Sequence, residues 1–237
     1  MSFLDQVNEF FGIFVGYLAP VLFYSVNGFP LIVIILLTGG LVFTFYFKFI
    51  NIRGFSHSID IIKGKYDNPN DTGQISHFQA LTSALSATIG LGNIAGVAVA
   101  VSLGGPGAVF WMVFIAFFSM SAKFVSCTLG QLYRQVNEDG SVSGGPMYYL
   151  DKGLKEKGLD KFGKVLGSIY AVFIIGGAFG GGNMFQANQS YELFGKLIGL
   201  PNYLYGLILA FLVGAVIVGG IRRIGQTTEK IVPIMVL

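Results

Sequence analysis

The sequence predicts an all-α integral membrane protein that contains a broken helix at membrane depth. Of its 237 residues, 53% are hydrophobic and only 11% are charged, whereas about 25% of the residues of an ordinary soluble domain are charged. Residues 72–122 contain no Asp, Glu, Lys or Arg, and an uncharged run of this length belongs in lipid. In its middle, Gly90 and Gly92 lie among hydroxyl and amide side chains. Because glycine weakens a helix by about 1 kcal/mol relative to alanine, these paired glycines predict a local break.

The composition also excludes several classes of protein. Cys127 is the single cysteine, so the sequence predicts neither a disulfide framework nor a cysteine metal cluster. His57 and His77 are too few and too scattered for a dedicated metal site. Nothing in the chain suggests a nucleic-acid partner. An N-terminal stretch with Asp5 and Glu9 does not match the basic start of a cleavable signal peptide.

The apolar segments give the predicted elements in chain order. Residues 1–28 form an N-terminal interfacial segment, in which the glycines and proline of 10–24 favour an interfacial or re-entrant helix over a spanning one. Residues 29–48 form an extra transmembrane helix ahead of the main domain. Further spans are predicted at 77–103, 108–128, 165–191 and 197–221.

Polar loops separate these spans. A loop with a turn at 68–73 covers 48–74, and a tight turn lies at 104–107. The longest loop covers 134–164 and includes a piece rich in Asp, Lys and Glu that suits a short amphipathic surface helix. After a polar stretch at 222–230, residues 231–237 begin another apolar segment, which indicates that the chain stops within a helix. On this map no Asp or Glu lies inside a span.

The basic residues predict the orientation in the membrane. All Lys and Arg residues except Lys196 fall on one side of the predicted spans. The positive-inside rule assigns that side to the cytoplasm. We therefore expect a multi-pass protein of the cell (cytoplasmic) membrane with its N-terminus outside.

The predicted break offers groups that bind ions and carboxylates. Backbone carbonyls released near Gly90–Gly92 are hard oxygen ligands for a small cation, and the Asn93 side chain adds another oxygen. The N–H groups that begin the following half-helix favour an anionic group such as a carboxylate. The alternative is helix packing, because Gly92 and Gly96 form a small-xxx-small pattern. The polar load of Thr82, Ser83, Ser86, Thr88 and Asn93 exceeds what packing requires and favours a site.

The fourth predicted span carries a second group of candidate ligands. Asn183 and Gln186 lie three residues apart and so share a helix face. Uncharged amides can hydrogen-bond a zwitterionic ligand without the cost of a buried charge, although hydrogen bonding between helices is an equally good reason for them. We expect the glycines of 176–182 to allow close contact with the second span.

Three motifs in this chain resemble the alanine or glycine:cation symporter family (sodium:alanine symporters). They are Ala84-Leu-Ser-Ala-Thr-Ile-Gly-Leu-Gly-Asn-Ile-Ala-Gly-Val-Ala98, Gly104-Gly-Pro-Gly-Ala-Val-Phe-Trp-Met112 and Gly144-Gly-Pro-Met-Tyr-Tyr149. The resemblance implies an inverted-repeat fold like that of neurotransmitter:sodium symporters, with five plus five core helices. Residues 75–237 would then be the first repeat of the transporter core, truncated in its fifth helix, and the second wall of the site would lie outside these residues.

The same resemblance implies roles for individual residues. Backbone at Thr88, Gly90, Leu91 and Gly92, with the Asn93 side chain, would contact a substrate carboxylate. Thr88 and Asn93 would also contact one sodium ion, and the carbonyls of Ser86 and Ile89 a second. Together with Asn183 and Gln186 these residues make up the predicted site.

These observations predict sodium-coupled symport of a small neutral amino acid, alanine or glycine, by alternating access. One alternative is a proton-coupled amino-acid permease, which would need a titratable carboxylate in the membrane. An intramembrane enzyme is a further alternative. It would need Ser/His, His/Asp or paired Asp groups at bilayer depth, which the predicted spans lack.

Overall fold

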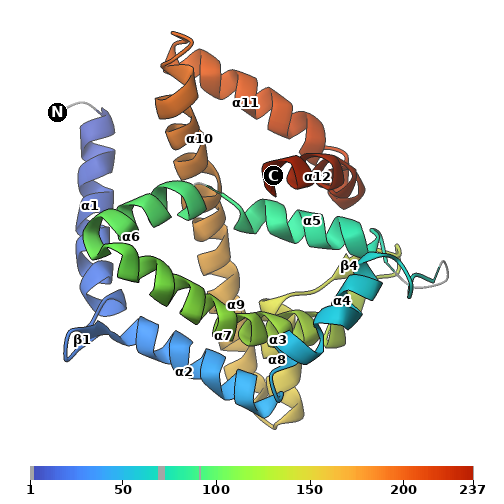
Figure 1. Cartoon of the computed structure of the whole chain (residues 1–237). Coiled ribbons are helices and arrows are strands. Elements are labelled where there is room, and N and C mark those ends of the chain that lie inside the picture. Colours follow the sequence, from blue (N-terminus) through green and yellow to red (C-terminus); the bar gives the residue numbers. More distant parts are fainter. Residues whose placement is uncertain (1–2, 69–72, 91, 237) are drawn as a thin grey trace. The chain divides into compact units, whose positions relative to one another are not determined.

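The computed structural model describes residues 3–68, 73–90 and 92–236 and is built of helices joined by short turns and two small hairpins (Figure 1). The α-helices are α1 (Phe3–Leu22), α2 (Leu31–Tyr46), α3 (Ile50–Arg53), α4 (Phe55–Ile62), α5 (His77–Thr88), α6 (Val97–Gly104), α7 (Pro106–Leu132), α8 (Pro146–Glu156), α9 (Asp160–Gly177), α10 (Phe185–Ser190), α11 (Asn202–Ile217) and α12 (Gly220–Val236). Wider π-helical turns form η1 (Gly92–Gly96), η2 (Ala178–Met184) and η3 (Tyr191–Gly195). The hairpins pair β1 (Ser25–Val26) with β2 (Phe29–Pro30) and β3 (Gln135–Val136) with β4 (Val142–Ser143).

The chain forms two compact units, each of which has its own contacts. One unit comprises Met1–Arg53 with Phe110–Val125, and the other comprises Gly54–Val109 with Ser126–Leu237. The first holds α1, α2 and the middle of α7. The second holds α5 and α6, the α8–α9 pair and everything after them, including all the predicted site residues.

In the first unit, α2 packs on α7 through a small polar contact. A Cβ built on Gly40 would lie 3.2 Å from the Phe118 carbonyl oxygen, so the missing side chain lets the two helices approach closely. At this point Thr44 Oγ1 donates to Ser121 Oγ at 2.9 Å, and both side chains are fully buried. A hydrogen bond between membrane helices contributes on average about 0.6 kcal/mol, so close packing and this bond together fix the register of α2 against α7.

Two regions predicted as loops contain helices. Helix α4 lies within the predicted loop 48–74 because Phe55, Ile59 and Ile62 recur at helical spacing among polar residues. Helix α12 begins at Gly220 and runs through the predicted polar stretch 222–230 into the apolar segment after it. That stretch is part of an amphipathic helix and not a loop: its charged residues share one face, and it contains no proline before Pro233.

Other boundaries agree more closely with the predictions. The turn at 104–107 is present, with Gly105 at φ +65° between α6 and α7. The predicted amphipathic surface helix is α8. Helix α1 starts at Phe3, earlier than the predicted Phe10, and α9 starts at Asp160, earlier than the predicted Val165.

Within the described residues, two continuous helices are long and apolar enough to cross a membrane, α7 and the run Asp160–Gly195 that joins α9 to η3. A third is present if α11 and α12, which meet at a bend of 113°, are counted as one span. The five predicted spans are therefore not five straight helices. The segment 77–103 is interrupted, and α2, at 16 residues, is about 24 Å long at 1.5 Å per residue.

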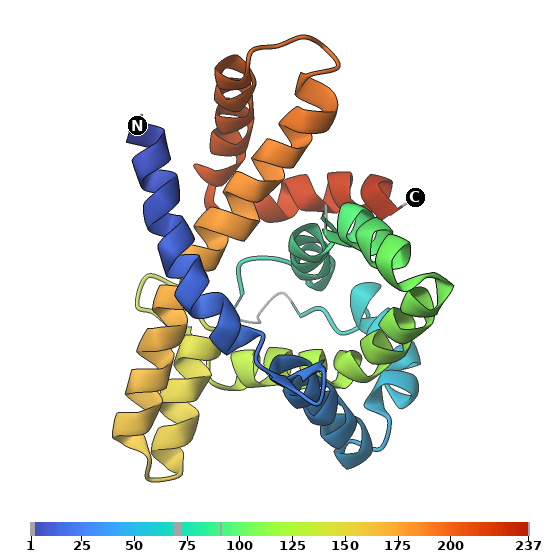
Figure 2. The same cartoon turned by 90° about the vertical axis from the view of Figure 1, so that its left-hand side faces the viewer.

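In the second unit, α8 and α9 lie side by side (Figure 2). A Cβ built on Gly163 would lie 2.7 Å from the Leu150 carbonyl oxygen, and one on Gly167 would lie 2.9 Å from that of Met147. Real side chains do not come this close to backbone atoms, so α8 can approach α9 only because both positions are glycine.

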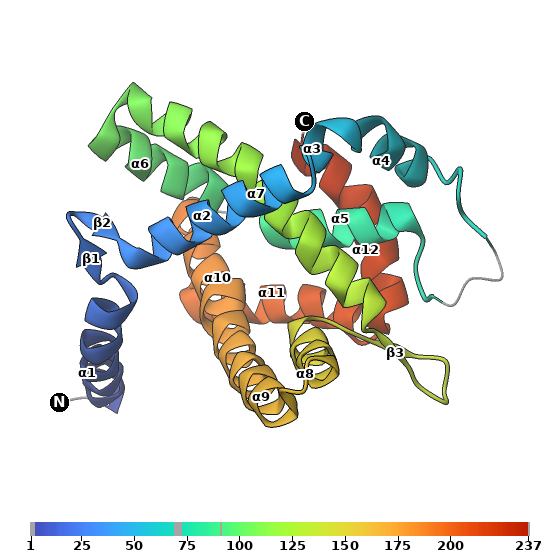
Figure 3. The same ribbon diagram turned by 90° about the horizontal axis from the view of Figure 1, so that it is seen from below.

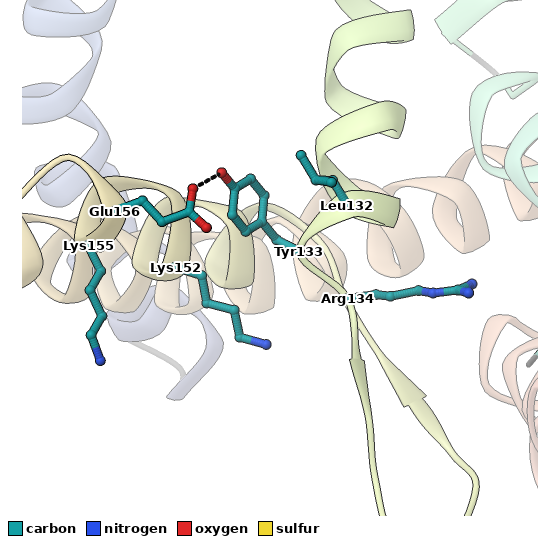
Figure 4. Close-up of a pocket in the computed structure, with 6 residues that line it drawn as sticks. All are labelled: Leu132, Tyr133, Arg134, Lys152, Lys155 and Glu156. Carbon is teal, nitrogen blue, oxygen red and sulfur yellow. Dashed lines mark hydrogen bonds between the residues drawn. The ribbon is translucent and has the colours of Figure 1, made fainter.

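The end of α7 is joined to α8 by a hydrogen bond between Tyr133 and Glu156. The Tyr133 hydroxyl donates to Glu156 Oε2 at 2.7 Å (Figure 4). This hydrogen bond raises the pKa of Tyr133 above its usual value, with smaller contributions from desolvation and from the negative charge of Glu156.

We expect Gly163→Ala and Gly167→Ala to destabilise the protein. The added methyl group meets backbone carbonyls that cannot move without displacing α8, and overpacking of this kind costs about 1–3 kcal/mol. Thermal unfolding in detergent should show a lower Tm for both variants. Gly176→Ala is the matched control, because a Cβ there has open space and alanine is the better helix former. An unchanged Tm for Gly163→Ala would contradict the close α8–α9 contact.

We also expect the ionisation of Tyr133 to depend on Glu156. Because the folded-state pKa is raised, the contact stabilises the fold below about pH 10, the ordinary tyrosine value, and this contribution is lost as pH rises through the folded-state pKa. An ultraviolet titration, taken as the difference between the protein and its Tyr133→Phe variant, should give a lower midpoint in Glu156→Gln. Glu138→Gln, in the β3–β4 turn, should leave the midpoint unchanged, and equal midpoints in all three would argue against the hydrogen bond.

Candidate functional site

The interruption predicted at Gly90–Gly92 is present. Helix α5 ends at Thr88 because Ile89 has an extended backbone (φ −85°, ψ 101°), and helical structure resumes with η1 at Gly92. Leu91, which the sequence places in the site, lies outside the described residues. A helix end leaves carbonyls, and a helix start leaves N–H groups, without partners in the helical ladder. Two such ends therefore lie a few residues apart in a segment without charged residues.

The hydroxyl groups before the break donate to their own helix. Ser86 Oγ donates to the Ser83 carbonyl at 2.7 Å, and Thr88 Oγ1 donates to the Ala84 carbonyl at 2.9 Å. A hydroxyl that gives its proton to a carbonyl keeps its oxygen lone pairs for another partner. Both side chains can thus act as oxygen ligands to a cation without giving up these hydrogen bonds.

Gln186 of α10 lies beside the break. A Cβ built on Gly90 would come within 3.4 Å of Gln186 Nε2 and 3.7 Å of Oε1, so the carboxamide lies against the Cα of Gly90. The structure thereby brings together two residues that are 96 positions apart in the sequence and that the sequence assigns to the same site. The amide is half-buried, whereas Thr88, Gly92 and Asn93 are exposed.

Asn183 is arranged differently from Gln186. Its Nδ2 donates to the Ala178 carbonyl at 2.9 Å, five residues earlier within the π-helical turn η2. The side chain therefore satisfies the wide turn of its own helix, and only its amide oxygen is left for another partner. The prediction of a shared face assumed α-helical spacing, which the π-helical turn at Asn183 does not have.

Among the described residues, Gly92 and Gly96 are not packing positions. A Cβ built on Gly92 or on Gly96 would meet no described atom within 4 Å, and the same holds for Gly176, Gly177, Gly180 and Gly181. The expectation that the glycines of 176–182 contact the second span is therefore wrong. They lie in and before η2, where the helix widens. The packing interpretation of Gly92 and Gly96 has no partner among the described residues.

The sequence did not predict the polar contact between α5 and α12, which lie against each other in Figures 1 and 3. Gln79 Nε2 donates to Glu229 Oε2 at 2.9 Å, and Ser83 Oγ lies 3.1 Å from Thr228 Oγ1. On the α5 side the sequence does carry a signal: Ser76 and Gln79 have the spacing of a capping box, which indicates the start of α5. On the α12 side, Thr228 and Glu229 lie in the stretch 222–230 that was predicted to be a loop. Glu229 is thus a carboxylate on a helix that packs against the broken helix. The predicted map of spans placed no Asp or Glu in such a helix.

Two hollows of the surface lie away from the break. The larger, of about 530 Å³, lies at the end of α7 and is lined by Leu132, Tyr133, Arg134, Lys152, Lys155 and Glu156 (Figure 4). A smaller one, of about 340 Å³, lies against α8 and α9. No predicted site residue lines either. Groups of three or more His, Cys, Asp or Glu side chains arranged for a metal ion are absent from the described part of the chain, so a cation near the break would rely on backbone, hydroxyl and amide oxygens.

Comparison with known proteins finds relatives that are named as amino-acid symporters and carriers. The chain is 44% identical over 214 residues to the sodium/alanine symporter AgcS of Methanococcus maripaludis, an alignment that covers 89% of this chain and 47% of the relative. It is 35% identical over 208 residues to a probable sodium/glutamine symporter, GlnT, of Bacillus subtilis, which covers 86% of this chain and 41% of the relative. A putative sodium/proton-dependent alanine carrier protein of the same bacterium, YrbD, is 36% identical over 206 residues, or 87% of this chain and 40% of the relative.

The chain therefore spans less than half the length of these relatives. The model of the sodium:alanine symporter family matches residues 16–237, which include the break, Gln186 and the α5–α12 contact. The matched relatives are transporters and not enzymes, and the apolar helices fit a multi-pass membrane protein. Because this match covers nearly the whole sequence, the chain belongs to the sodium:alanine symporter family.

Proposed function

We propose that this chain provides one wall of the site of a symporter that couples a sodium ion to a small neutral amino acid, alanine or glycine, and works by alternating access. The observation that carries this proposal is the interruption of the helix between Thr88 and Gly92, with the Gln186 amide beside it. Broken backbone at membrane depth persists where protein or a water-filled cavity satisfies its polar groups. A bound ion and a bound carboxylate would meet that requirement.

In this proposal the two ends at the break bind groups of opposite charge. Backbone at Thr88, Gly90, Leu91 and Gly92, with the Asn93 side chain, binds the substrate carboxylate. Oxygens of Ser86, Thr88, Ile89 and Asn93 bind sodium. Gln186 hydrogen-bonds the amino acid, and Asn183 contributes its amide oxygen. The hydroxyl geometry at Ser86 and Thr88, with protons already donated to carbonyls, supports the role of these oxygens toward a cation.

The energetics of coupling suit a neutral substrate. One sodium ion that moves down a membrane potential of about 100 mV releases roughly 2.3 kcal/mol. A tenfold sodium gradient adds about 1.4 kcal/mol, since each tenfold ratio has that value. Together these support an accumulation of several hundred-fold for an uncharged solute.

The wider architecture belongs to the same proposal. Residues 1–28 are an interfacial segment, 29–48 an extra transmembrane helix, and 75–237 the first of two inverted repeats, with the N-terminus outside the cell. Because the related proteins are more than twice as long as the matched region, a second repeat would supply the opposite wall. The volume of the complete pocket would then decide among alanine, glycine and larger amides.

Proton coupling is the second candidate, and Glu229 is the observation that favours it. Its carboxylate accepts a hydrogen bond from Gln79 across the α5–α12 contact, which places a titratable group beside the broken helix. One relative is named as a sodium/proton-dependent carrier. This candidate requires uptake that is driven by a pH gradient in the absence of sodium.

We expect alanine uptake into proteoliposomes to require sodium. The protein, expressed from its full reading frame, should accumulate labelled alanine when sodium is outside, because inward sodium flow drives the coupled step. Replacing sodium with choline should abolish accumulation. Uptake that is equal in choline and sodium, or that follows a pH gradient alone, would contradict sodium coupling and favour the second candidate.

We expect Asn93→Ala and Gln186→Ala to separate the two ligands. Loss of the Asn93 oxygen should raise the sodium concentration for half-maximal uptake about tenfold or more, since an ion ligand is removed. Loss of the Gln186 amide should raise the KM for alanine by a similar factor with little change in sodium dependence, because a hydrogen bond to the substrate is lost. Gln189→Ala, near the end of the same helix run, is the control. Unaltered sodium activation in Asn93→Ala would count against its role.

A further inference from the structure

We infer that Glu229 and Thr228 of α12 are positioning residues that hold the half-helix before the break, and that transport requires the α5–α12 contact to open and close. The contact is defined by two pairs, Gln79 with Glu229 and Ser83 with Thr228, and by the buried Thr82 between them. The inference rests on the proposed transport function for its role, but the contact itself can be tested without it.

Gln79 connects the start of α5 to α12 through both ends of its carboxamide. Its Oε1 accepts from the Ser76 backbone N–H at 3.2 Å, while its own backbone N–H donates to Ser76 Oγ at 3.2 Å. Its Nε2 donates to Glu229 Oε2 at 2.9 Å. The side chain is therefore fixed at both ends, and the cap of α5 and the carboxylate of α12 hold one another in place.

The next turn of α5 adds a pair of hydroxyl groups. Thr228 Oγ1 donates to the Gly225 carbonyl at 3.1 Å, so it is placed to accept from Ser83 Oγ at 3.1 Å. Thr82 is 2% exposed, lies 3.4 Å from the same Thr228 oxygen and donates back into α5. A single threonine of α12 therefore contacts two successive residues of α5.

The residues of the contact recur at helical spacing on both helices. On α12 they are Gly225, Thr228 and Glu229, and on α5 they are Gln79, Thr82 and Ser83. Val232 and Ser86 continue the same helical spacing, so each set has the spacing of one helix face. Gly225 is buried, and a Cβ on it would lie 3.3 Å from Gln79 Cβ. Val232 is 2% exposed. Ser86, the last position of the α5 face, is the first proposed sodium ligand.

The hydrogen bonds between α5 and α12 are weak enough for the two helices to separate. Hydrogen bonds between membrane helices change an equilibrium by only a few-fold each, so the two pairs together bias it by about tenfold. An ionised carboxylate accepts a stronger hydrogen bond than a neutral acceptor does. Glu229 can therefore hold the Gln79 amide through this hydrogen bond, with no ion pair. We infer that α12 sets the position of α5, and with it the carbonyls that end at Thr88.

A reversible cross-link tests whether the contact must open. Gln79→Cys and Gly225→Cys should form a disulfide in a Cys127→Ser background, because their Cβ atoms are near the 3.5–4.5 Å that a disulfide spans. We expect the oxidised protein, expressed from its full reading frame, to lose at least about tenfold of its alanine uptake, and reducing agent to restore it. Gln79→Cys with Thr227→Cys is the control that should not cross-link, because helical spacing puts position 227 on the opposite side of α12 from Gly225. Uptake that is unchanged in the cross-linked protein would overturn the inference.

Single substitutions test which property of α12 matters. Glu229→Leu and Thr228→Val should each lower the maximal uptake rate about three- to tenfold while the KM for alanine changes less than about twofold. Glu229→Gln should recover most of the rate, because its amide oxygen still accepts from Gln79. Thr227→Val and Glu192→Gln are the matched controls. Equal losses in Glu229→Leu and Glu229→Gln, or in Thr228→Val and Thr227→Val, would overturn the positioning role.

The two proposals fail in distinguishable ways. If the parent protein takes up no alanine with sodium, the proposed function fails, whereas formation of the disulfide still reports the contact between the two helices. If the parent protein transports and the cysteine pair does not cross-link under oxidant, the contact is wrong and the proposed function stands.

Discussion

The constraint on which this structure depends is that backbone polar groups in a membrane need partners. Helix α5 stops at Thr88 and structure resumes at Gly92, within residues 72–122 that have no charged side chain. A helix end leaves carbonyls and a helix start leaves N–H groups without partners in the helical ladder, and across this break the Asn93 N–H donates to the Gly90 carbonyl at 3.0 Å. Hydroxyls that have already donated their protons and a carboxamide against Gly90 surround these ends. At membrane depth such groups need partners from protein or from a water-filled cavity.

Glycine has two opposite uses in this chain: at some positions it allows neighbouring elements to approach closely, and at others it has open space around it. At Gly40, Gly163, Gly167 and Gly225 a Cβ would come within 3.3 Å of a neighbouring element, so these positions hold helices together. At Gly92, Gly96 and the glycines before and within η2 there is open space. Sequence spacing alone does not distinguish the two, since Gly92-xxx-Gly96 has the pattern of a packing motif and packs on nothing described.

Much of the candidate site could be predicted because its signals are local. Paired glycines predicted the break, and Gln186, which the sequence assigned to the same candidate site, lies against Gly90. Both α4 and α12 lie in stretches predicted as loops. In α12 the charged residues Arg222, Arg223, Glu229 and Lys230 resemble a loop, because membrane helices are predicted from continuous apolar sequence. In an amphipathic helix such residues occupy one face. The π-helical turn at Asn183 could not be foreseen, because it depends on how the whole helix run packs.

The consequence of α12 being a helix reaches the site itself. Gln79, Ser83 and Ser86 lie on one face of α5. Gln79 and Ser83 contact α12, and Ser86 lies in the last turn of α5 before the break. A short helix moves as a rigid rod, because each of its residues is tied to the next turn. Displacing α12 from α5 would therefore tilt the carbonyl end at Thr88 relative to Gln186. A helix that had been continuous through residues 89–91 would resist that tilt, so the same interruption that exposes the ligand groups also frees the half-helix that carries them.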